Sequence, residues 1–266
     1  MLQTLRTVNI IRYATPLREG GSLPAIAEAD DGFLYVVKFR GAGQGSKALI
    51  ADLLGGEIAR ACGFKVPEIV FATLDESFGR TEPDEEIQDL LKASVGLNLG
   101  LHYLSGAITY DPAVTKLTSL VASRIVWLDA YLMNVDRTCR NTNMLTWRNE
   151  LWLIDHGASL YFHHGTHNPI AIGWKEAAIK PFTHIKDHVL LWKADEMEDA
   201  DAYIKTLLTE EKLADIVSLV PEEWIEKDFG QSPDDTRGMY LEFLTQRINN
   251  SEVFLKEVNH ASDTLI

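Results

Sequence analysis

The patterning of the chain changes from β-type to helical near Pro112, and this change limits the folds that the chain can adopt. Before it, short β-rich runs alternate with turn signals, at residues 7–13, 23–29, 33–40 and 66–74. One helix is expected among them, at about residues 46–62. After it, helical periodicity prevails, beginning with one long apolar helix over residues 113–133. Strands first and helices later predict an α+β protein.

The size and composition of the chain indicate an ordinary globular protein. Its 266 residues can bury a sizeable core as one large domain or as two lobes, and 46% are hydrophobic. No apolar run approaches the ~20 residues that cross a bilayer, so no membrane association is expected. The first residues carry no apolar signal segment, which predicts a cytoplasmic location. Cys62 and Cys139 are then expected to be reduced thiols.

The charge of the chain is negative and unevenly spread. The net charge is −14, and residues 195–266 alone hold 6 basic and 18 acidic side chains. A broadly acidic surface repels a phosphate backbone, so direct nucleic-acid binding is not expected. Residues 1–74 and 111–194 are close to neutral and could hold a small phosphate ligand. These two blocks also carry the motifs.

The stretch NVDRTCRNTNMLTWRNELWLIDHG, at residues 134–157, concentrates polar groups at one place. Asp136 and Asn141 lie five apart in the loop expected after the long helix. Asp155 ends the second of two short strands, and a hairpin would fold it back beside Asp136. This spacing is the D-x-x-x-x-N and D-x-G arrangement of protein kinases. Lys38 lies on an N-terminal strand, where the phosphate-binding lysine of a kinase belongs.

These segments resemble the HipA-like kinases, in particular their shorter branch. The matching segments are GGSLP (20–24), DDGFLYVVKF (30–39), SKALIADLLGGEIARACGFKVPEI (46–69), GLNLGLHYL (96–104), NVDRTCRN (134–141) and LWLIDHG (151–157). They span about 140 residues in the same order as in the family. The resemblance implies a two-lobed protein-kinase-like fold that forms one kinase domain. Residues 1–104 would be a small β-rich N-lobe and residues 105–266 a larger helical C-lobe.

The resemblance also implies roles for individual residues. Asp136 would be the catalytic base, and Asn141 and Asp155 would hold Mg²⁺, a hard cation that prefers carboxylate and amide oxygens. Lys38 would bind the α- and β-phosphates of ATP. The implied reaction is ATP- and Mg²⁺-dependent transfer of the γ-phosphate to a hydroxyl, expected to be a serine or threonine of a protein.

Two acidic residues of the N-terminal helix could pair with Lys38. Asp52 stands where the family usually has a glutamate, and Glu57 lies five residues further on. Five residues turn a helix by ~500°, which leaves the two carboxylates about 140° apart, so only one can face Lys38. Asp52 shares its face with small residues that suit close packing, and we favour it.

Two glycine-rich segments compete for the role of cradling phosphate with backbone amides. Gly20, Gly21 and Ser22 lie between the first two predicted strands, where a kinase glycine loop would be. Residues 41–45, GAGQG, instead follow the strand of Lys38 and precede a helix. We favour the first segment because it fits kinase topology better.

Several histidines look like candidate ligands but fit better as packing or loop residues. His163, His164 and His167 form a metal-like patch without an evident further ligand, and a polar loop after the D-x-G turn is the favoured interpretation. His156 replaces the phenylalanine of the kinase D-F-G motif, and a packing histidine with satisfied hydrogen bonds is the favoured interpretation over a catalytic one.

The sequence leaves the phosphate acceptor open. A kinase of the same fold that acts on a small molecule is one alternative. Another is a nucleotide-binding regulatory protein with little turnover. Family members can act as toxins paired with an antitoxin, and this chain has no helix-turn-helix of its own, so a DNA-binding antitoxin-like partner would be a separate protein.

Overall fold

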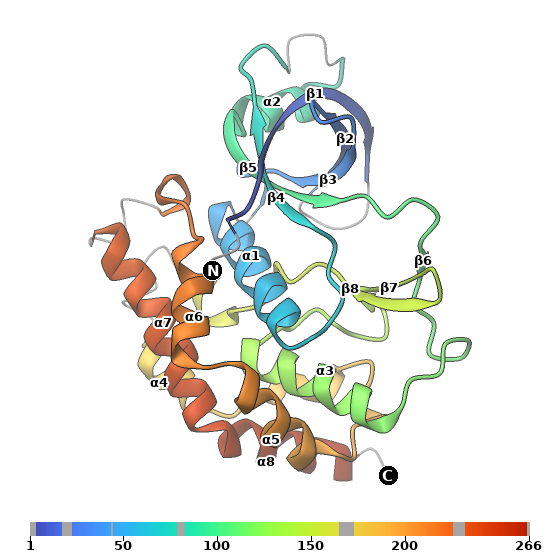
Figure 1. Ribbon diagram of the computed structural model, residues 1–266, viewed down its shortest axis with the longest axis vertical. Helices are drawn as coiled ribbons and strands as arrows, with labels where there is room; N and C mark the ends of the chain where they lie inside the picture. The colour runs from blue at the N-terminus through green and yellow to red at the C-terminus, as the bar shows by residue number, and fades with distance from the viewer. Residues whose placement is uncertain are drawn as a thin grey trace.

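The computed structural model describes residues 4–17, 23–43, 45–78, 83–164, 173–225 and 232–264. The chain is a mixed α and β structure, with strands before helices as expected (Figure 1). The described strands of its N-terminal part close into a barrel in the order β1-β2-β3-β5-β4. Their bounds are β1 (Thr7–Pro16), β2 (Ala25–Ala29), β3 (Leu34–Lys38), β4 (Ile69–Leu74) and β5 (Gly96–His102).

Strand β1 closes the barrel because it pairs with a different neighbour at each end. Residues 7–9 lie parallel to β4, whereas residues 10–16 lie antiparallel to β2. The register with β2 is interrupted twice, between Ile10 and Arg12 and between Tyr13 and Thr15. Such bulges bend and twist a strand, which lets one strand serve both neighbours.

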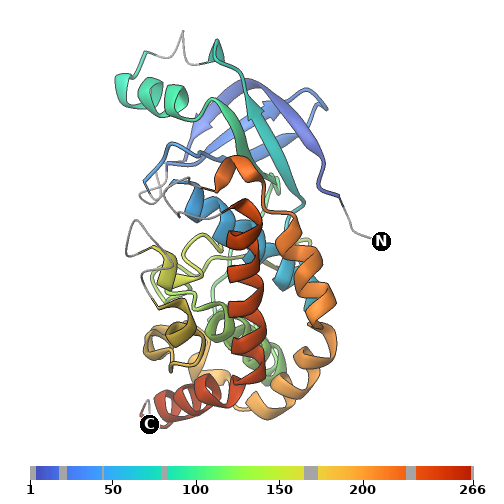
Figure 2. The same ribbon diagram turned by 90° about the vertical axis from the view of Figure 1, so that its left-hand side faces the viewer.

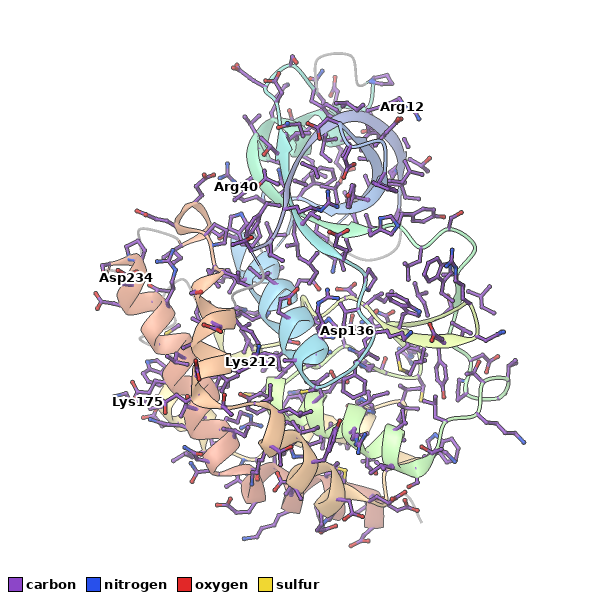
Figure 3. All side chains as sticks on the ribbon, in the orientation of Figure 1. Arg12, Arg40, Asp136, Lys175, Lys212 and Asp234 are labelled. Atoms are coloured by element: carbon purple, nitrogen blue, oxygen red, sulfur yellow. The ribbon has the colours of Figure 1, made fainter. Side chains whose placement is uncertain are left out.

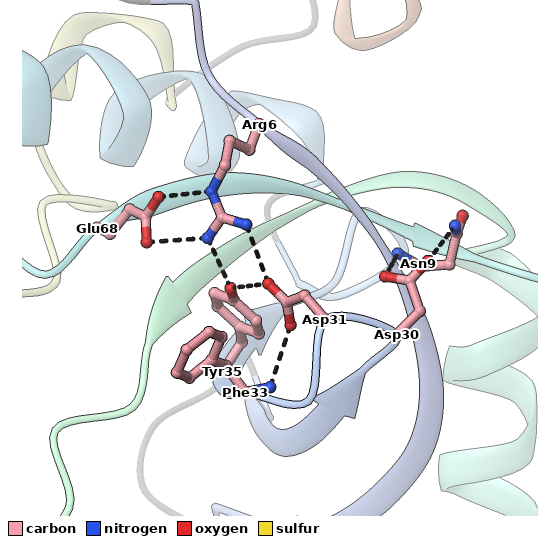
Figure 4. Close-up of polar contacts among 7 residues, drawn as sticks. All are labelled: Arg6, Asn9, Asp30, Asp31, Phe33, Tyr35 and Glu68. Atoms are coloured by element: carbon pink, nitrogen blue, oxygen red, sulfur yellow. Dashed lines mark hydrogen bonds and ion pairs between the residues drawn. The ribbon is translucent and has the colours of Figure 1, made fainter.

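A polar cluster at the edge of the barrel ties the residue before β1 to two other segments (Figure 4). The guanidinium of Arg6 donates to both carboxylate oxygens of Glu68, at 2.8 and 3.0 Å. It also donates to Asp31 and to the hydroxyl of Tyr35, each at 3.0 Å. The Arg6 side chain is about half exposed, so these contacts fix geometry more than they stabilise the fold.

Helix α1 (Ser46–Ala61) lies between the barrel and the helices below it (Figures 1 and 2). Nearly all of its residues are buried, including both apolar and charged ones. A helix that is buried on every side is a central element of a core, not a surface helix. Its bounds confirm the helix that the sequence predicts at about residues 46–62. Its apolar side chains belong to the same core as those of the C-terminal helices.

A small antiparallel sheet follows the barrel, formed by β6 (Ile108–Thr109), β7 (Met144–Trp147) and β8 (Glu150–Leu153). Strands β7 and β8 are the predicted hairpin, with Met144 opposite Leu153. Two residues with positive φ, Arg148 and Asn149, make the turn. The hairpin brings Asp155 back to the segment that precedes it.

Helices form the rest of the described chain. They are α2 (Glu85–Ala93), which lies beside the barrel, α3 (Ser119–Leu132), α4 (Trp174–Ala178), α5 (Met197–Leu207), α6 (Glu210–Ser218), α7 (Pro233–Asn249) and α8 (Ser251–Asp263). The expected helix at 113–133 begins six residues late. Thr118 caps it by accepting a hydrogen bond from the amide of Val121, so residues 113–118 stay outside. None of the described helices is both long and apolar enough to cross a membrane.

Candidate active site

A cleft of about 1720 Å³ runs below the barrel. The described residues that were predicted for the catalytic, phosphate-binding and metal sites line it: Lys38, Asp52, Asp136, Asn141 and Asp155. Its walls come from β3, the end of β5, α1, the loop after α3 and the segment after β8. Asp136 lies in the middle of the molecule, below the barrel (Figure 3). The cleft thus collects side chains that are more than a hundred residues apart in the sequence.

Lys38 enters the cleft from the end of β3 and bridges two carboxylates. Its Nζ lies 2.6 Å from Oδ1 of Asp155 and also forms an ion pair with Oδ2 of Asp52. Burial alone would lower the pKa of Lys38, but the charges of Asp155 and Asp52 raise it above its ordinary value. Lys38 is therefore a fully charged ammonium held in place on two sides.

Asp52 contacts Lys38, and Glu57 does not. Asp52 is 1% exposed on α1, and its Oδ1 accepts a 2.7 Å hydrogen bond from the amide of His156. Glu57 is turned to Arg60, at 3.3 Å. Burial raises the pKa of Asp52, as does the charge of Asp155, while Lys38 opposes both. The helix face favoured from the sequence is the face that meets Lys38.

Asp155 lies just beyond β8, in a left-handed backbone conformation with φ 52°. Its side chain is 41% exposed, so it reaches both Lys38 and the open cleft. Burial of its oxygens would raise its pKa, but the ammonium of Lys38 lowers it below the ordinary value. Asp155 is thus an ionised carboxylate at the edge of the cleft.

Asp136 lies in the loop after α3, and two amide groups hold its carboxylate. Oδ2 of Asp136 accepts a hydrogen bond from Nδ2 of Asn141 at 2.7 Å and another from Nδ2 of Asn143 at 3.1 Å. Burial raises the pKa of Asp136, and the nearby charge of Asp155 adds to this, while both amides oppose it. Asn143 was not identified from the sequence, because only Asn141 fits the kinase spacing.

A buried ionic cluster under this loop was also missed. Asp129 on α3 accepts hydrogen bonds from Nε of Arg137 at 2.5 Å, Nε2 of His188 at 2.9 Å and Nδ2 of Asn134 at 2.9 Å. Burial would raise the pKa of Asp129, but Arg137 and His188 hold it well below its ordinary range. The one signal in the sequence is a lone aspartate inside the apolar run SLVASRIVWLDAYL.

His156, which follows Asp155, is fully buried against α1. A Cβ added to Gly55 would lie 2.5 Å from Cβ of His156, so only glycine allows this approach. Among the described residues neither ring nitrogen has a hydrogen-bond partner. Burial lowers the pKa of His156 to about 3, so the ring is neutral. His156 is therefore a packed histidine, but within the described residues its ring is not satisfied by hydrogen bonds as expected.

Only the second of the two glycine-rich candidate segments has described residues. Gly20, Gly21 and Ser22 lie outside the described residues. In the second segment, a Cβ on Gly41 would come within 2.6 Å of Cβ of Ala93, so this glycine serves the contact with α2. Gly43 and Gly45, by contrast, line the cleft next to the first turn of α1.

The polar loop expected for the histidine patch is wrong for His163, which is fully buried at the end of a short 3₁₀ helix, Tyr161–His163. Nδ1 of His163 lies 2.8 Å from the hydroxyl of Tyr240, and Nε2 of His164 lies 2.9 Å from the carbonyl of Ser159. His167 lies outside the described residues. Over the described ranges, no group of three or more His, Cys, Asp or Glu side chains is placed to hold a metal ion.

Comparison with known proteins agrees with this arrangement of residues. Residues 8–254 match the sequence profile of HipA-like kinases. The chain belongs to the HipA-like kinase family. A comparison with curated protein sequences finds no significant match.

Solved structures also resemble this HipA-like kinase. The Helicobacter pylori proinflammatory kinase CtkA superposes with a TM-score of 0.55 at 12% identity, covering 99% of this chain and 98% of CtkA. The Golgi casein kinase gives a TM-score of 0.42 at 11% identity, covering 94% of this chain and 72% of that one. CtkA supports a kinase-like fold, and the family supports a phosphotransferase.

Proposed function

We propose that this HipA-like kinase transfers the γ-phosphate of ATP to a hydroxyl in an Mg²⁺-dependent reaction, with serine or threonine of a protein as the acceptor. One observation carries the proposal: the pair of Lys38 with Asp52, the carboxylate of Asp155 and the pair of Asp136 with Asn141 all converge in one cleft. Phosphoryl transfer depends mainly on such positioning and charge.

The upper part of the cleft suits a nucleotide. Its apolar lining includes Val36, Leu101, Leu104, Met144 and Ile154, which can cover the flat faces of a base. Lys38 would then meet the α- and β-phosphates. The backbone amide of Gly43, or those of Gly20, Gly21 and Ser22, would cradle the phosphates.

We assign the two sides of the cleft to two lobes of one kinase domain. Residues 1–104 would form the nucleotide-binding N-lobe, with the barrel and Lys38. Residues 105–266 would form the C-lobe, with Asp136, Asn141 and Asp155. The proposal is supported by β6, which pairs with β7 and so joins the part that follows residue 104.

The oxygens at the edge of the cleft fit a divalent cation. Asp155 offers an ionised carboxylate. Asn141 uses Nδ2 on Asp136, and within the described residues no hydrogen bond to its amide oxygen is found, so this oxygen can serve as a ligand. Both are the hard oxygen donors that Mg²⁺ prefers. Bound there, the ion would offset the charge of the phosphate oxygens. Asp155 would share its charge between this cation and Lys38.

Asp136 would take the proton of the acceptor hydroxyl. As that O–H bond breaks, the acceptor oxygen forms a bond to the γ-phosphorus, and the bond from that phosphorus to the β,γ-bridging oxygen breaks. The electron pair of the broken bond leaves with ADP. Burial raises the pKa of Asp136, which makes its carboxylate a better proton acceptor.

A protein acceptor suits the shape of the site. Cys139, Arg140 and Asn141, which follow Asp136, are exposed at the cleft, so a hydroxyl on a large molecule can reach it. We also propose a cytoplasmic enzyme that binds neither nucleic acid nor membrane directly. An antitoxin-like regulator would be a separate protein.

Incubation of the pure protein with labelled ATP, Mg²⁺ and a cell lysate tests the proposal. We expect label in protein bands with the wild type, and a loss of roughly 10²-fold or more with Asp136→Asn, which removes the base. Label only in small molecules would instead favour a small-molecule acceptor. Equal labelling by both forms would refute the role of Asp136, and no turnover with intact nucleotide binding would favour a regulatory protein.

A further inference from the structure

Asn143 makes two contacts with Asp136 that the D-x-x-x-x-N spacing of kinases does not predict. Its Nδ2 donates to the carboxylate oxygen Oδ2 of Asp136 at 3.1 Å and lies 3.4 Å from the backbone carbonyl of the same residue. One amide group thus contacts both the side chain and the backbone of the proposed base.

Asn143 is itself held firmly. It is 6% exposed and has a positive φ of 47°, a conformation that asparagine tolerates better than most residues. Its carbonyl accepts hydrogen bonds from the side chain of Arg137 and, at 3.0 Å, from the amide of Ile154. Arg137 in turn is fixed by the buried carboxylate of Asp129. The backbone of Asn143 is therefore anchored to α3, through Arg137, and to the segment that leads to Asp155, and the side-chain amide extends from this fixed backbone to Asp136.

The two amides on Asp136 are not equivalent. Asn141 is exposed, and its oxygen is the proposed metal ligand, so its orientation has to serve two partners. Asn143 is buried and has no such second task in the proposed mechanism. Both amides donate to Oδ2, and within the described chain no hydrogen bond to Oδ1 is found. The carboxylate is thereby left with one oxygen for the acceptor hydroxyl.

We propose that Asn143 is a positioning residue that orients the carboxylate of Asp136 so that Oδ1 faces the acceptor hydroxyl. This inference rests on the proposed function of Asp136 as the base. Asn143 contacts neither ATP nor metal in this scheme. Its loss therefore acts on the chemical step and leaves nucleotide binding unchanged.

The substitution Asn143→Gly removes the amide and keeps a residue that tolerates positive φ. We expect kcat for ADP formation from ATP and Mg²⁺ to fall by roughly 10- to 100-fold, as a misplaced catalytic group usually causes. The KM for ATP should stay within about twofold of the wild type. Asn143→Asp puts a second carboxylate beside Asp136. Its kcat should fall at least as far as that of Asn143→Gly, although aspartate is closer to asparagine in shape than glycine is.

Asn149→Gly is the matched control. Asn149 also has a positive φ, 63°, but lies exposed in the turn between β7 and β8, away from the cleft lining. It should leave kcat and KM unchanged. Equal losses of kcat in both glycine variants would overturn the positioning role. So would a lower kcat for Asn143→Gly that is accompanied by an equally large rise in the KM for ATP.

A double variant separates this inference from the proposed function. Once Asp136→Asn has removed the base, adding Asn143→Gly should cause no further loss, because the two residues act as one unit. Full activity in Asp136→Asn would refute the proposed base. Loss in Asp136→Asn with full activity in Asn143→Gly would refute the inference alone.

A spectroscopic test needs no turnover. In the ¹⁵N–¹H spectrum, Asp136→Ala should shift the side-chain amide signal of Asn143, because it removes the carboxylate that the amide contacts. An unchanged Asn143 signal would overturn the inference. The signal of Asn149 serves as the internal reference that should not move.

Discussion

Nζ of Lys38 lies 2.6 Å from Oδ1 of Asp155, which joins the end of β3 to the segment after β8 across 117 residues of sequence. The same ammonium contacts Asp52 on α1. Lys38 and Asp52 are both buried, with side chains 11% and 1% exposed. One cation thus holds two carboxylates from separate parts of the fold, and its loss should affect stability as well as nucleotide binding.

Lys38→Met should lower the free energy of unfolding by about 3–5 kcal/mol, because it leaves Asp52 as a buried carboxylate without its cation. Asp52→Asn in the same chain should recover part of this loss, since the amide carries no charge. Urea denaturation of the two single variants and the double variant measures the coupling. Both single variants should also weaken ATP binding.

Glu57→Gln is the control for this cycle. Glu57 lies on the same helix but pairs with Arg60, so its loss should not couple to Lys38→Met. Coupling of Glu57, and none of Asp52, would contradict the helix face that the structure presents to Lys38.

The second prediction concerns the metal. ATP should bind at least tenfold more tightly in Mg²⁺ than in EDTA, because the proposed ligands are oxygens of Asn141 and Asp155. Asp155→Asn should remove most of this difference in calorimetric titrations. Glu150→Gln, at the other end of β8, should keep it. A wild-type affinity that is the same in both buffers would argue against the ligand assignment.

Much of the candidate site could be predicted because its residues follow a fixed order. Lys38 was recognised by its strand, and Asp136, Asn141 and Asp155 by their spacing around a helix end and a hairpin. Helical geometry shows only that one of Asp52 and Glu57 can face Lys38, and the small residues on the face of Asp52 favour Asp52. Lys38 and Asp52 lie on periodic elements, which fix where a side chain points, whereas Asp136, Asn141 and Asp155 lie in the segments that follow such elements.

The remainder depends on contacts that leave no local pattern. Asp129 and His188 are 59 residues apart, and neither has a spacing signal. The barrel closes because residues 7–9 pair with β4, which lies some sixty residues later in the chain. No turn motif in the sequence predicts this pairing. The start of α3 was misplaced because apolar periodicity continues through residues 113–118, although the cap at Thr118 fixes the boundary.

The third prediction concerns the cluster under the catalytic loop. Asp129→Asn leaves the charge of Arg137 and the ring nitrogen of His188 without their carboxylate and should cost about 3–5 kcal/mol of unfolding free energy. It should also lower kcat, because Arg137 holds the carbonyl of Asn143. Asp234→Asn, which removes a 92% exposed carboxylate that pairs with Arg237, should change neither quantity measurably. A silent Asp129→Asn would show that the loop is positioned by other contacts.

The last prediction is a dependence of stability on pH that arises from His163. This ring is fully buried, and burial, together with the neighbouring His164 and Lys47, lowers its pKa well below 6.5. Between that lowered value and about 6.5, the unfolded chain binds a proton that the folded chain does not. The free energy of unfolding therefore falls as the pH drops below about 6.5, by up to ~1.4 kcal/mol per pH unit for this group.

His163→Gln removes the titrating group, so the decline in stability between pH 6.5 and 5 should become shallower. At pH 8 the variant should be less stable by about 1–2 kcal/mol, because the contact with the hydroxyl of Tyr240 is weakened. His260→Gln, at an exposed position on α8, should keep the wild-type slope. Urea denaturation at several pH values measures the free energy of unfolding of the wild type and both variants. An equal slope in wild type and His163→Gln would mean that His163 is protonated in the folded chain, against the burial that keeps it neutral.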